Sequence, residues 1–174
     1  MVFLVFLNHY DQKMHVLGKS LPEYLKGSYV KVYTRYESKE YEYCEAKDTF
    51  AKIREYAQVF DQVIVSFGIR LFPPSAYHDL LKKYKNSVKN LVFLKKLKGS
   101  KTWTVSEDGL TFDNYRIADS GLFVLQAKDI LASKTDNFNT HIKDLVARQE
   151  MDYRFISYWI STNKPYSKEE RKKK

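Results

Sequence analysis

Residues 1–7, MVFLVFL, form a near-continuous apolar run at the start of the chain. A short run of this kind is typical of a strand that is buried on both faces, as in a parallel sheet covered by helices. The next seven residues, NHYDQKM, are mostly polar and contain no glycine. Ligands of open α/β sheets bind beyond the carboxyl ends of the strands, so we predict that residues 8–14 face a binding crevice.

The composition indicates a globular protein of one domain. The chain has 174 residues, of which 44% are apolar and 16% aromatic, which is too apolar for a disordered protein. No apolar stretch approaches the roughly 18 residues that span a bilayer. Residues 1–7 are too short for a signal-peptide core and lack a basic start and a cleavage site. We therefore expect a cytoplasmic protein with no membrane partner.

The chain is basic, with a formal net charge of +9. Its last eight residues, SKEERKKK, are rich in lysine, so we expect one domain over residues 1–166 and a disordered basic tail over 167–174. A basic excess favours anionic partners such as nucleotides and nucleic acid. The lysine-rich segments 82–89 and 95–101 indicate a nucleic-acid-binding module as one possible function, and a solvated basic surface explains the charge equally well.

Hydrophobic periodicity predicts strands and helices in alternation. Runs of β-branched and aromatic residues predict strands at 28–33, 40–44, 62–66, 90–94, 101–105, 110–112, 120–125 and 153–157. Apolar residues at helical spacing predict helices after a cap at Asp48, at 76–85 after a cap at Ser75, at 127–132 and around 138–146. This order predicts a three-layer α/β fold, with a mostly parallel sheet, helices on both faces, and a short antiparallel edge between residues 101 and 112.

Cysteine and histidine form no recognisable metal or catalytic motif. Cys44 is the only cysteine, so an internal disulfide is impossible, and its context favours a small buried strand residue over a catalytic thiol. His15, His78 and His141 lack the spacing of metal ligands. We expect His78 and His141 to lie on helices as surface or half-buried residues.

Several of these segments, in this order, resemble the sugar-1-phosphate nucleotidyltransferases, whose catalytic domain is Rossmann-like. In that family the first strand leads into a glycine-rich loop that ends Gly-x-Arg-Leu, and here MVFLVFL leads into NHYDQKM. The family's Gly-Asp after a buried strand resembles Gly68–Ile69, and its Asn-x-Gly-Ile-Tyr strand resembles DSGLF at 119–123. Its Trp-x-Asp-x-Gly-Thr-Pro resembles WISTNKP at 159–165. The resemblance covers nearly the whole chain, and it lies in the order of these segments and in the spacing between them.

The resemblance implies a site that binds a nucleotide or a sugar phosphate. Its candidate nucleotide- and phosphate-binding residues are Asn8, His9, Asp11, Lys13 and Arg70. Asp119 and Gly121 fall where the family contacts the sugar. Asp119 could hydrogen-bond a sugar hydroxyl, and Gly121 permits a close approach of the backbone.

The same resemblance reveals departures at positions that the family's reaction needs. In that reaction a sugar phosphate oxygen attacks the α-phosphate of a nucleoside triphosphate, and Mg²⁺ is held by carboxylates. The two carboxylate positions are occupied here by Ile69 and Ser161, and Glu23 stands where the family has a lysine. We therefore predict a divergent domain that binds a nucleotide, a nucleotide sugar or a protein partner without standard Mg²⁺-dependent transfer.

Two alternatives stay open. The first is an active sugar-phosphate nucleotidyltransferase that uses replacement residues such as Asp11, Lys13 and Asp119, with Mg²⁺ held by Asp61 or Asp119. The second is the basic nucleic-acid-binding module. The sequence itself identifies no certain cofactor and no catalytic residue.

Overall fold

The computed structural model describes most of the predicted domain. The described residues are 2–7, 15–16, 19–20, 30–35, 37–39, 41–68, 75–94, 103–106, 109–112 and 121–155. Among them, no helix is long and apolar enough to cross a membrane.

A sheet of seven strands forms the centre of the molecule, in the order β11-β7-β10-β6-β1-β4-β5. Its strands are β1 (Val2–Leu7), β4 (Val30–Thr34), β5 (Glu42–Tyr43), β6 (Gln62–Phe67), β7 (Asn90–Leu94), β10 (Leu122–Gln126) and β11 (Met151–Phe155). β1 pairs in parallel with β4 on one side and with β6 on the other, and all six of its residues are buried. The apolar run at the start of the chain is thus a central strand, as predicted.

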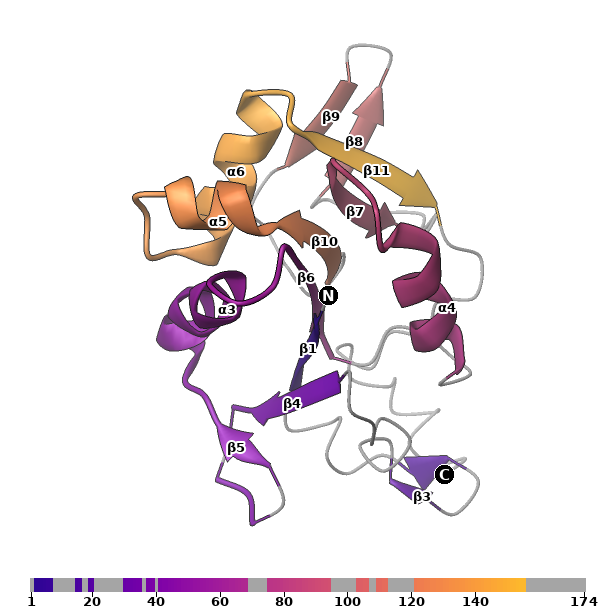
Figure 1. The fold of residues 1–174 in the computed structure, drawn as a ribbon, viewed down its shortest axis with the longest axis vertical. Helices are drawn as coiled ribbons and strands as arrows, with labels where there is room; N and C mark the ends of the chain where they lie inside the picture. Colours follow the sequence, from indigo (N-terminus) through magenta and orange to yellow (C-terminus); the bar gives the residue numbers. More distant parts are fainter. Residues whose placement is uncertain are drawn as a thin grey trace, which may run out of the picture.

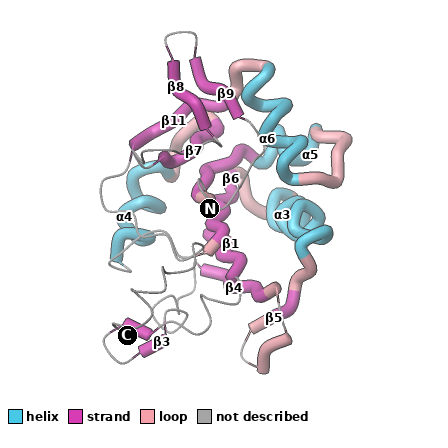
Figure 2. Tube along the Cα trace, turned by 180° about the vertical axis from the view of Figure 1, so that it is seen from behind, coloured by secondary structure: helices cyan, strands magenta, loops and turns pink. Residues whose placement is uncertain are grey.

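Helices cover both faces of this sheet. In Figure 1, α3 (Thr49–Ala57), α5 (Ala127–Ala132) and α6 (Phe138–Ala147) lie on one side of the strands, and α4 (Ser75–Tyr84) lies on the other. Figure 2 shows the same arrangement from behind. Side chains of β1 alternate between the two cores: Leu4 and Phe6 pack with the three-helix layer, whereas Phe3 and Val5 share a cluster with Leu80 of α4. The three-layer α/β fold is confirmed.

The antiparallel strand of the large sheet is not at the edge between residues 101 and 112 that the sequence predicts. The predicted hairpin is present as β8 (Trp103–Ser106) and β9 (Gly109–Phe112), but these strands form a two-stranded sheet of their own. The antiparallel strand of the large sheet is β10, which lies between β6 and β7. Gly121 lies beside the carboxyl end of β6, so the chain enters β10 from that edge and must run against its neighbours. Periodicity predicts a strand and carries no information about its direction. Two further short strands, β2 (His15–Val16) and β3 (Lys19–Ser20), form another small sheet.

The structure corrects the predicted N-terminal caps of two helices. Asp48 precedes α3, but it makes no side-chain capping bond, because it ends a 3₁₀ turn (Ala46–Asp48) and its backbone is not extended (φ −97°, ψ 3°). Thr49 instead donates its hydroxyl to the carbonyl of Ala46 at 2.8 Å. α4 begins at Ser75 itself, one residue before the predicted start. Asn137 caps α6 by accepting the Thr140 N–H at 3.0 Å.

Candidate functional site

The carboxyl ends of three parallel strands meet at one edge of the sheet. β1, β4 and β6 end there, at Leu7, Thr34 and Phe67. Backbone hydrogen bonds join the residues that leave these strands: Gly68 N–H donates to Phe6 at 2.8 Å, and Arg35 N–H donates to Leu7 at 3.2 Å. This carboxyl edge is where an open α/β sheet binds its ligand. Residues 8–14, which the sequence predicts to face this edge, lie outside the described residues.

Gly68 ends β6 in a conformation that suits glycine. Its φ is +82°, in the left-handed region that residues with a Cβ rarely adopt. The Ser66 hydroxyl donates to the Gly68 carbonyl at 2.6 Å and fixes the turn. Gly68 is buried, so this turn forms part of the floor of the carboxyl edge. The resemblance to the sugar-1-phosphate nucleotidyltransferases matches Gly68 to the family's glycine after the same strand. The positive φ of Gly68 explains why a glycine is needed at this position.

Arg35 places a cation at this edge directly after β4. Its guanidinium carbon lies 4.7 Å from the ring centroid of Phe6, in a cation–π arrangement. Its Nη1 donates to the carbonyls of Cys44 and Glu45, at 3.1 and 3.3 Å. Burial lowers the pKa of the Arg35 guanidinium, but arginine is so basic that it stays protonated at neutral pH. The sequence prediction missed this residue, although a basic residue directly after a strand of a parallel sheet was a usable signal.

Aromatic rings support this cation from below. Phe6 stacks on Tyr33 and on Phe67, with ring centroids 5.6 and 5.7 Å away. Phe67 in turn contacts Phe138 of α6 edge-on, at 5.0 Å. The rings come from three adjacent strands and one helix, so the base of the carboxyl edge is rigid and apolar.

The structure describes one of the seven residues that the sequence proposed for the site. Gly121 is buried at the carboxyl edge, where its carbonyl accepts the Phe67 N–H at 2.7 Å. This bond gives Gly121 a structural part in joining β10 to β6. The other six lie outside the described residues and stay predictions: Asn8, His9, Asp11, Lys13, Arg70 and Asp119.

The described residues form no cluster of side chains that could ligate Mg²⁺. A magnesium ion requires hard oxygen ligands, usually one or two carboxylates. No group of three metal-ligating side chains occurs among the described residues, and the two positions that the resemblance assigns to the metal ligands, 69 and 161, lie outside them. Asp61, which the sequence offered as a replacement ligand, precedes β6 and so lies at the opposite edge, roughly 17 Å away for a strand of this length. That suggestion is wrong, because the direction of β6 carries Asp61 away from the site.

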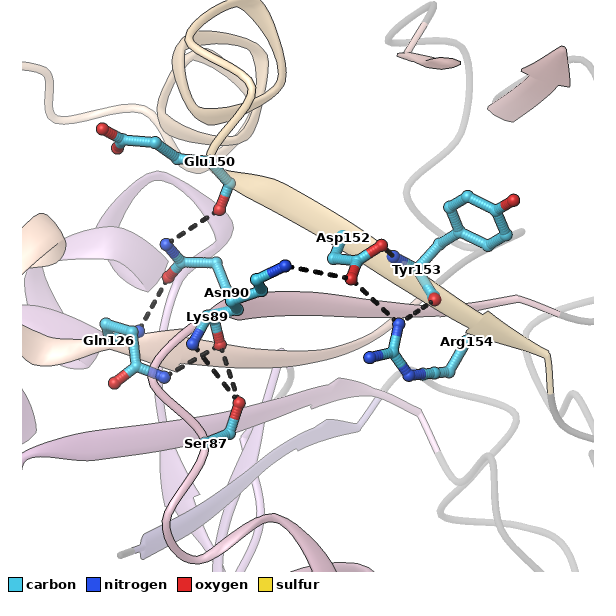
Figure 3. A network of polar contacts seen from close by, with 8 residues as sticks. All are labelled: Ser87, Lys89, Asn90, Gln126, Glu150, Asp152, Tyr153 and Arg154. Carbon is cyan, nitrogen blue, oxygen red and sulfur yellow. Dashed lines mark hydrogen bonds and ion pairs between the residues drawn. The ribbon is translucent and has the colours of Figure 1, made fainter. Parts of the chain in front are cut away.

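A network of polar contacts lies at this opposite, amino edge (Figure 3). Asn90 donates to the Asp129 carboxylate at 2.8 Å and to the Glu150 carbonyl at 3.2 Å, and it accepts the Gln126 N–H at 2.8 Å. The Gln126 amide donates to the Lys89 carbonyl at 2.9 Å. Asn90 is 2% exposed and makes bonds through both ends of its amide. This network therefore holds the ends of β7, β10 and β11 together.

A hollow of about 450 Å³ adjoins the network. Its charged lining residues are mixed in sign: Lys89, Lys128, Asp129, Glu150 and Asp152. Asp152 already contacts Lys89 at 3.8 Å and Arg154 at 3.0 Å. Since the charges of the hollow largely compensate one another, it does not compete with the carboxyl edge as an anion site.

The structure buries two titratable side chains, those of Cys44 and His141. Cys44 is buried as predicted, and burial raises the pKa of its thiol, which is the opposite of what a nucleophilic cysteine requires. His141 was predicted to be at the surface or half-buried but is 1% exposed, with its ring 4.9 Å from that of Phe50. Its spacing from Phe138, Ile142 and Leu145 places it on the buried face of α6 with them. Burial lowers the pKa of His141 to about 4.

Comparisons with known proteins show the fold. No family model matches the chain, and no curated protein matches its sequence. The chain is similar in structure to HddC from Yersinia pseudotuberculosis, with a TM-score of 0.61 and 14% identity over 99% of this chain and 97% of that one. It is also similar to a protein from Bacillus anthracis assigned as a glucose-1-phosphate thymidylyltransferase, solved with sucrose. That match has a TM-score of 0.56 and 10% identity, over 91% of this chain and 87% of that one. The protein therefore has a nucleotidyltransferase-like fold.

Proposed function

We propose that this protein is a divergent relative of the sugar-1-phosphate nucleotidyltransferases that binds a nucleotide or a nucleotide sugar at the carboxyl edge of its sheet, without standard Mg²⁺-dependent transfer. The observation that carries the proposal is the nucleotidyltransferase-like fold combined with a cation at this edge, Arg35, that makes no ion pair with a described carboxylate. The fold supports the place of binding, and the charge of the edge supports an anionic ligand.

The sequence gives the reason to separate binding from catalysis. Transfer brings together two anionic reactants, so it depends on charge neutralisation and positioning. The resemblance places the two metal-binding positions at Ile69 and Ser161. An isoleucine cannot bind a cation, and a neutral hydroxyl is a poor ligand for one. Basic side chains such as Lys13, Arg70 and Arg35 could still hold phosphates as direct partners.

Isothermal titration with nucleoside triphosphates and nucleotide sugars tests the proposal, with each ligand measured in EDTA and in excess Mg²⁺. We expect at least one of these ligands to bind in EDTA, and we expect no pyrophosphate when sugar-1-phosphates are added. Binding that strictly requires Mg²⁺, together with release of pyrophosphate, contradicts the proposal and favours an active transferase. The double variant Ile69→Asp, Ser161→Asp is the matched control, and we expect it to make binding of a triphosphate respond to Mg²⁺.

A nucleic-acid-binding function is the second candidate, because α4 and the turn after it expose a row of lysines. Lys82, Lys83 and Lys85 are all exposed. Contacts of this kind to phosphates make affinity fall linearly with the logarithm of salt concentration. Fluorescence anisotropy with labelled single- and double-stranded DNA and RNA across a salt series decides the matter. The absence of binding at low salt eliminates this candidate.

A further inference from the structure

Arg35 differs from every other arginine that the structure describes. Arg54, Arg148 and Arg154 each contact a carboxylate, at 3.3, 3.3 and 3.0 Å respectively. Among the described residues Arg35 contacts no carboxylate: its Nη1 donates to two backbone carbonyls, and its side chain also interacts with the thiol of Cys44. The contrast is therefore between three compensated guanidinium groups and one without a counterion in the described part of the chain.

Arg54 makes the comparison sharper because its setting is otherwise the same. It too lies over a phenylalanine, 4.8 Å from the ring centroid of Phe50, and it is also partly buried. Arg54 Nη2 donates to the carbonyls of Ser133 and Thr135, at 3.2 and 2.7 Å, while Nη1 contacts the Asp136 carboxylate. In Arg35, Nη1 alone carries both carbonyl bonds, and no carboxylate among the described residues takes the place of Asp136.

The unused atoms of Arg35 have a specific geometry. With Nη1 engaged, neither Nε nor Nη2 donates to a carbonyl or carboxylate oxygen of a described residue. The N–H groups of Nε and Nη2 lie in the guanidinium plane along one edge and form the parallel fork that matches a phosphate or carboxylate group. A partly buried cation without a counterion is costly, so a bound anion at this fork is favoured. The Phe6 ring and the two carbonyls already fix the side chain, so little rotamer entropy remains to be lost on binding.

The place of Arg35 agrees with this role. It follows β4 at the carboxyl edge, and its N–H donates to Leu7, the last residue of β1. We infer that Arg35 is a binding residue for a phosphate group of the ligand, held through its Nε and Nη2. This inference rests on the proposed function for its place in the molecule, and it assigns to one residue a task that the sequence had given only to Lys13, Arg70 and the segment 8–14.

Inorganic pyrophosphate is the probe, because it carries phosphate groups without a nucleoside. It is titrated into the full chain in EDTA, by calorimetry and by NMR of the arginine Nε–H signals. We expect the Arg35 signal to shift and the Arg54 signal to stay. We expect Arg35→Met to weaken binding roughly 10- to 100-fold, as for loss of a charge-assisted bidentate bond. Arg35→Lys keeps the charge and loses the fork, so it should weaken binding less. Arg54→Met is the matched control and should bind pyrophosphate as the wild type does.

The outcomes separate this inference from the proposed function. Equal affinity of the wild type and Arg35→Met overturns the inference, as does wild-type protein that binds no pyrophosphate. Nucleotide binding that is insensitive to both Arg35 substitutions also overturns it while leaving the proposed function intact. Pyrophosphate binding that depends on Arg35, in a protein that binds no nucleotide or nucleotide sugar, confirms the anion site and refutes the proposed function. Circular dichroism checks that each variant is folded, and the NMR shift in the wild type tests the inference without any substitution.

Discussion

The buried imidazole of His141 predicts how the stability of this protein depends on pH. Burial holds the pKa of His141 at about 4 in the folded state, against 6.5 for an exposed histidine. Charged groups near the ring largely offset one another, with Asp129 and Asp144 opposing Arg148 and Arg54. Because the folded pKa is the lower one, the unfolded chain binds the extra proton between these values. The stability contributed by neutral His141 is therefore complete above pH 6.5 and is lost as the pH falls towards 4.

The magnitude follows from the difference between the two pKa values. Each unit is worth about 1.4 kcal/mol, so the loss of unfolding free energy approaches about 3 kcal/mol at pH 4. Urea denaturation of the wild type and of His141→Phe at several pH values between 7.5 and 4.5 measures it. The variant keeps an aromatic ring against Phe50 and cannot titrate, so the wild type should lose more stability than the variant over this range. Identical pH dependence of the two proteins, or an NMR titration of His141 near 6.5, refutes the reasoning.

Three further predictions concern the scaffold around the site. Asn90→Leu leaves the buried Gln126 N–H without its acceptor, so it should lower the unfolding free energy by about 3 kcal/mol in urea denaturation. The control Asn86→Leu, in an exposed turn, should change the unfolding free energy by less than about 0.5 kcal/mol. Equal effects of the two substitutions contradict the structural role of the network. Gly68→Ala forces a side chain into a left-handed conformation and should cost about 1–2 kcal/mol in the same assay, and a neutral result argues against this backbone. Cys44 should react with a thiol reagent many times more slowly in the native protein than in urea, because it is buried and burial raises its pKa; equally fast labelling in both states contradicts its burial.

The fold could be predicted from the sequence where the pattern is strong and local. The apolar run of β1 identified a strand buried on both faces, and the boundaries of β7 and α5 were predicted to the residue. The direction of β10 was not predictable in this way, because strand propensity is the same in either direction. The direction of β6 also explains why Asp61 is not at the site. Asp61 adjoins β6 at the amino end of that strand, whereas the candidate site lies at its carboxyl end.

The candidate site was harder to predict because its properties depend on contacts between distant segments. Arg35 follows a predicted strand, but its significance depends on Phe6 from another strand and on the lack of a described carboxylate. His141 was predicted to be at the surface or half-buried because histidine is polar, although its spacing from Phe138 and Leu145 places it on the buried face of α6. Gly68 could be matched in sequence, and the need for a glycine became clear only from its positive φ.

Binding of a nucleotide in the absence of divalent metal is the most direct test of the central claim. The full chain is titrated in EDTA with nucleoside triphosphates and nucleotide sugars, and the affinities are compared with those of Arg35→Met and Arg54→Met. The account predicts that at least one nucleotide binds without Mg²⁺, that Arg35→Met weakens it, and that Arg54→Met does not. Failure of every nucleotide and nucleotide sugar to bind the folded protein, with and without Mg²⁺, contradicts the account.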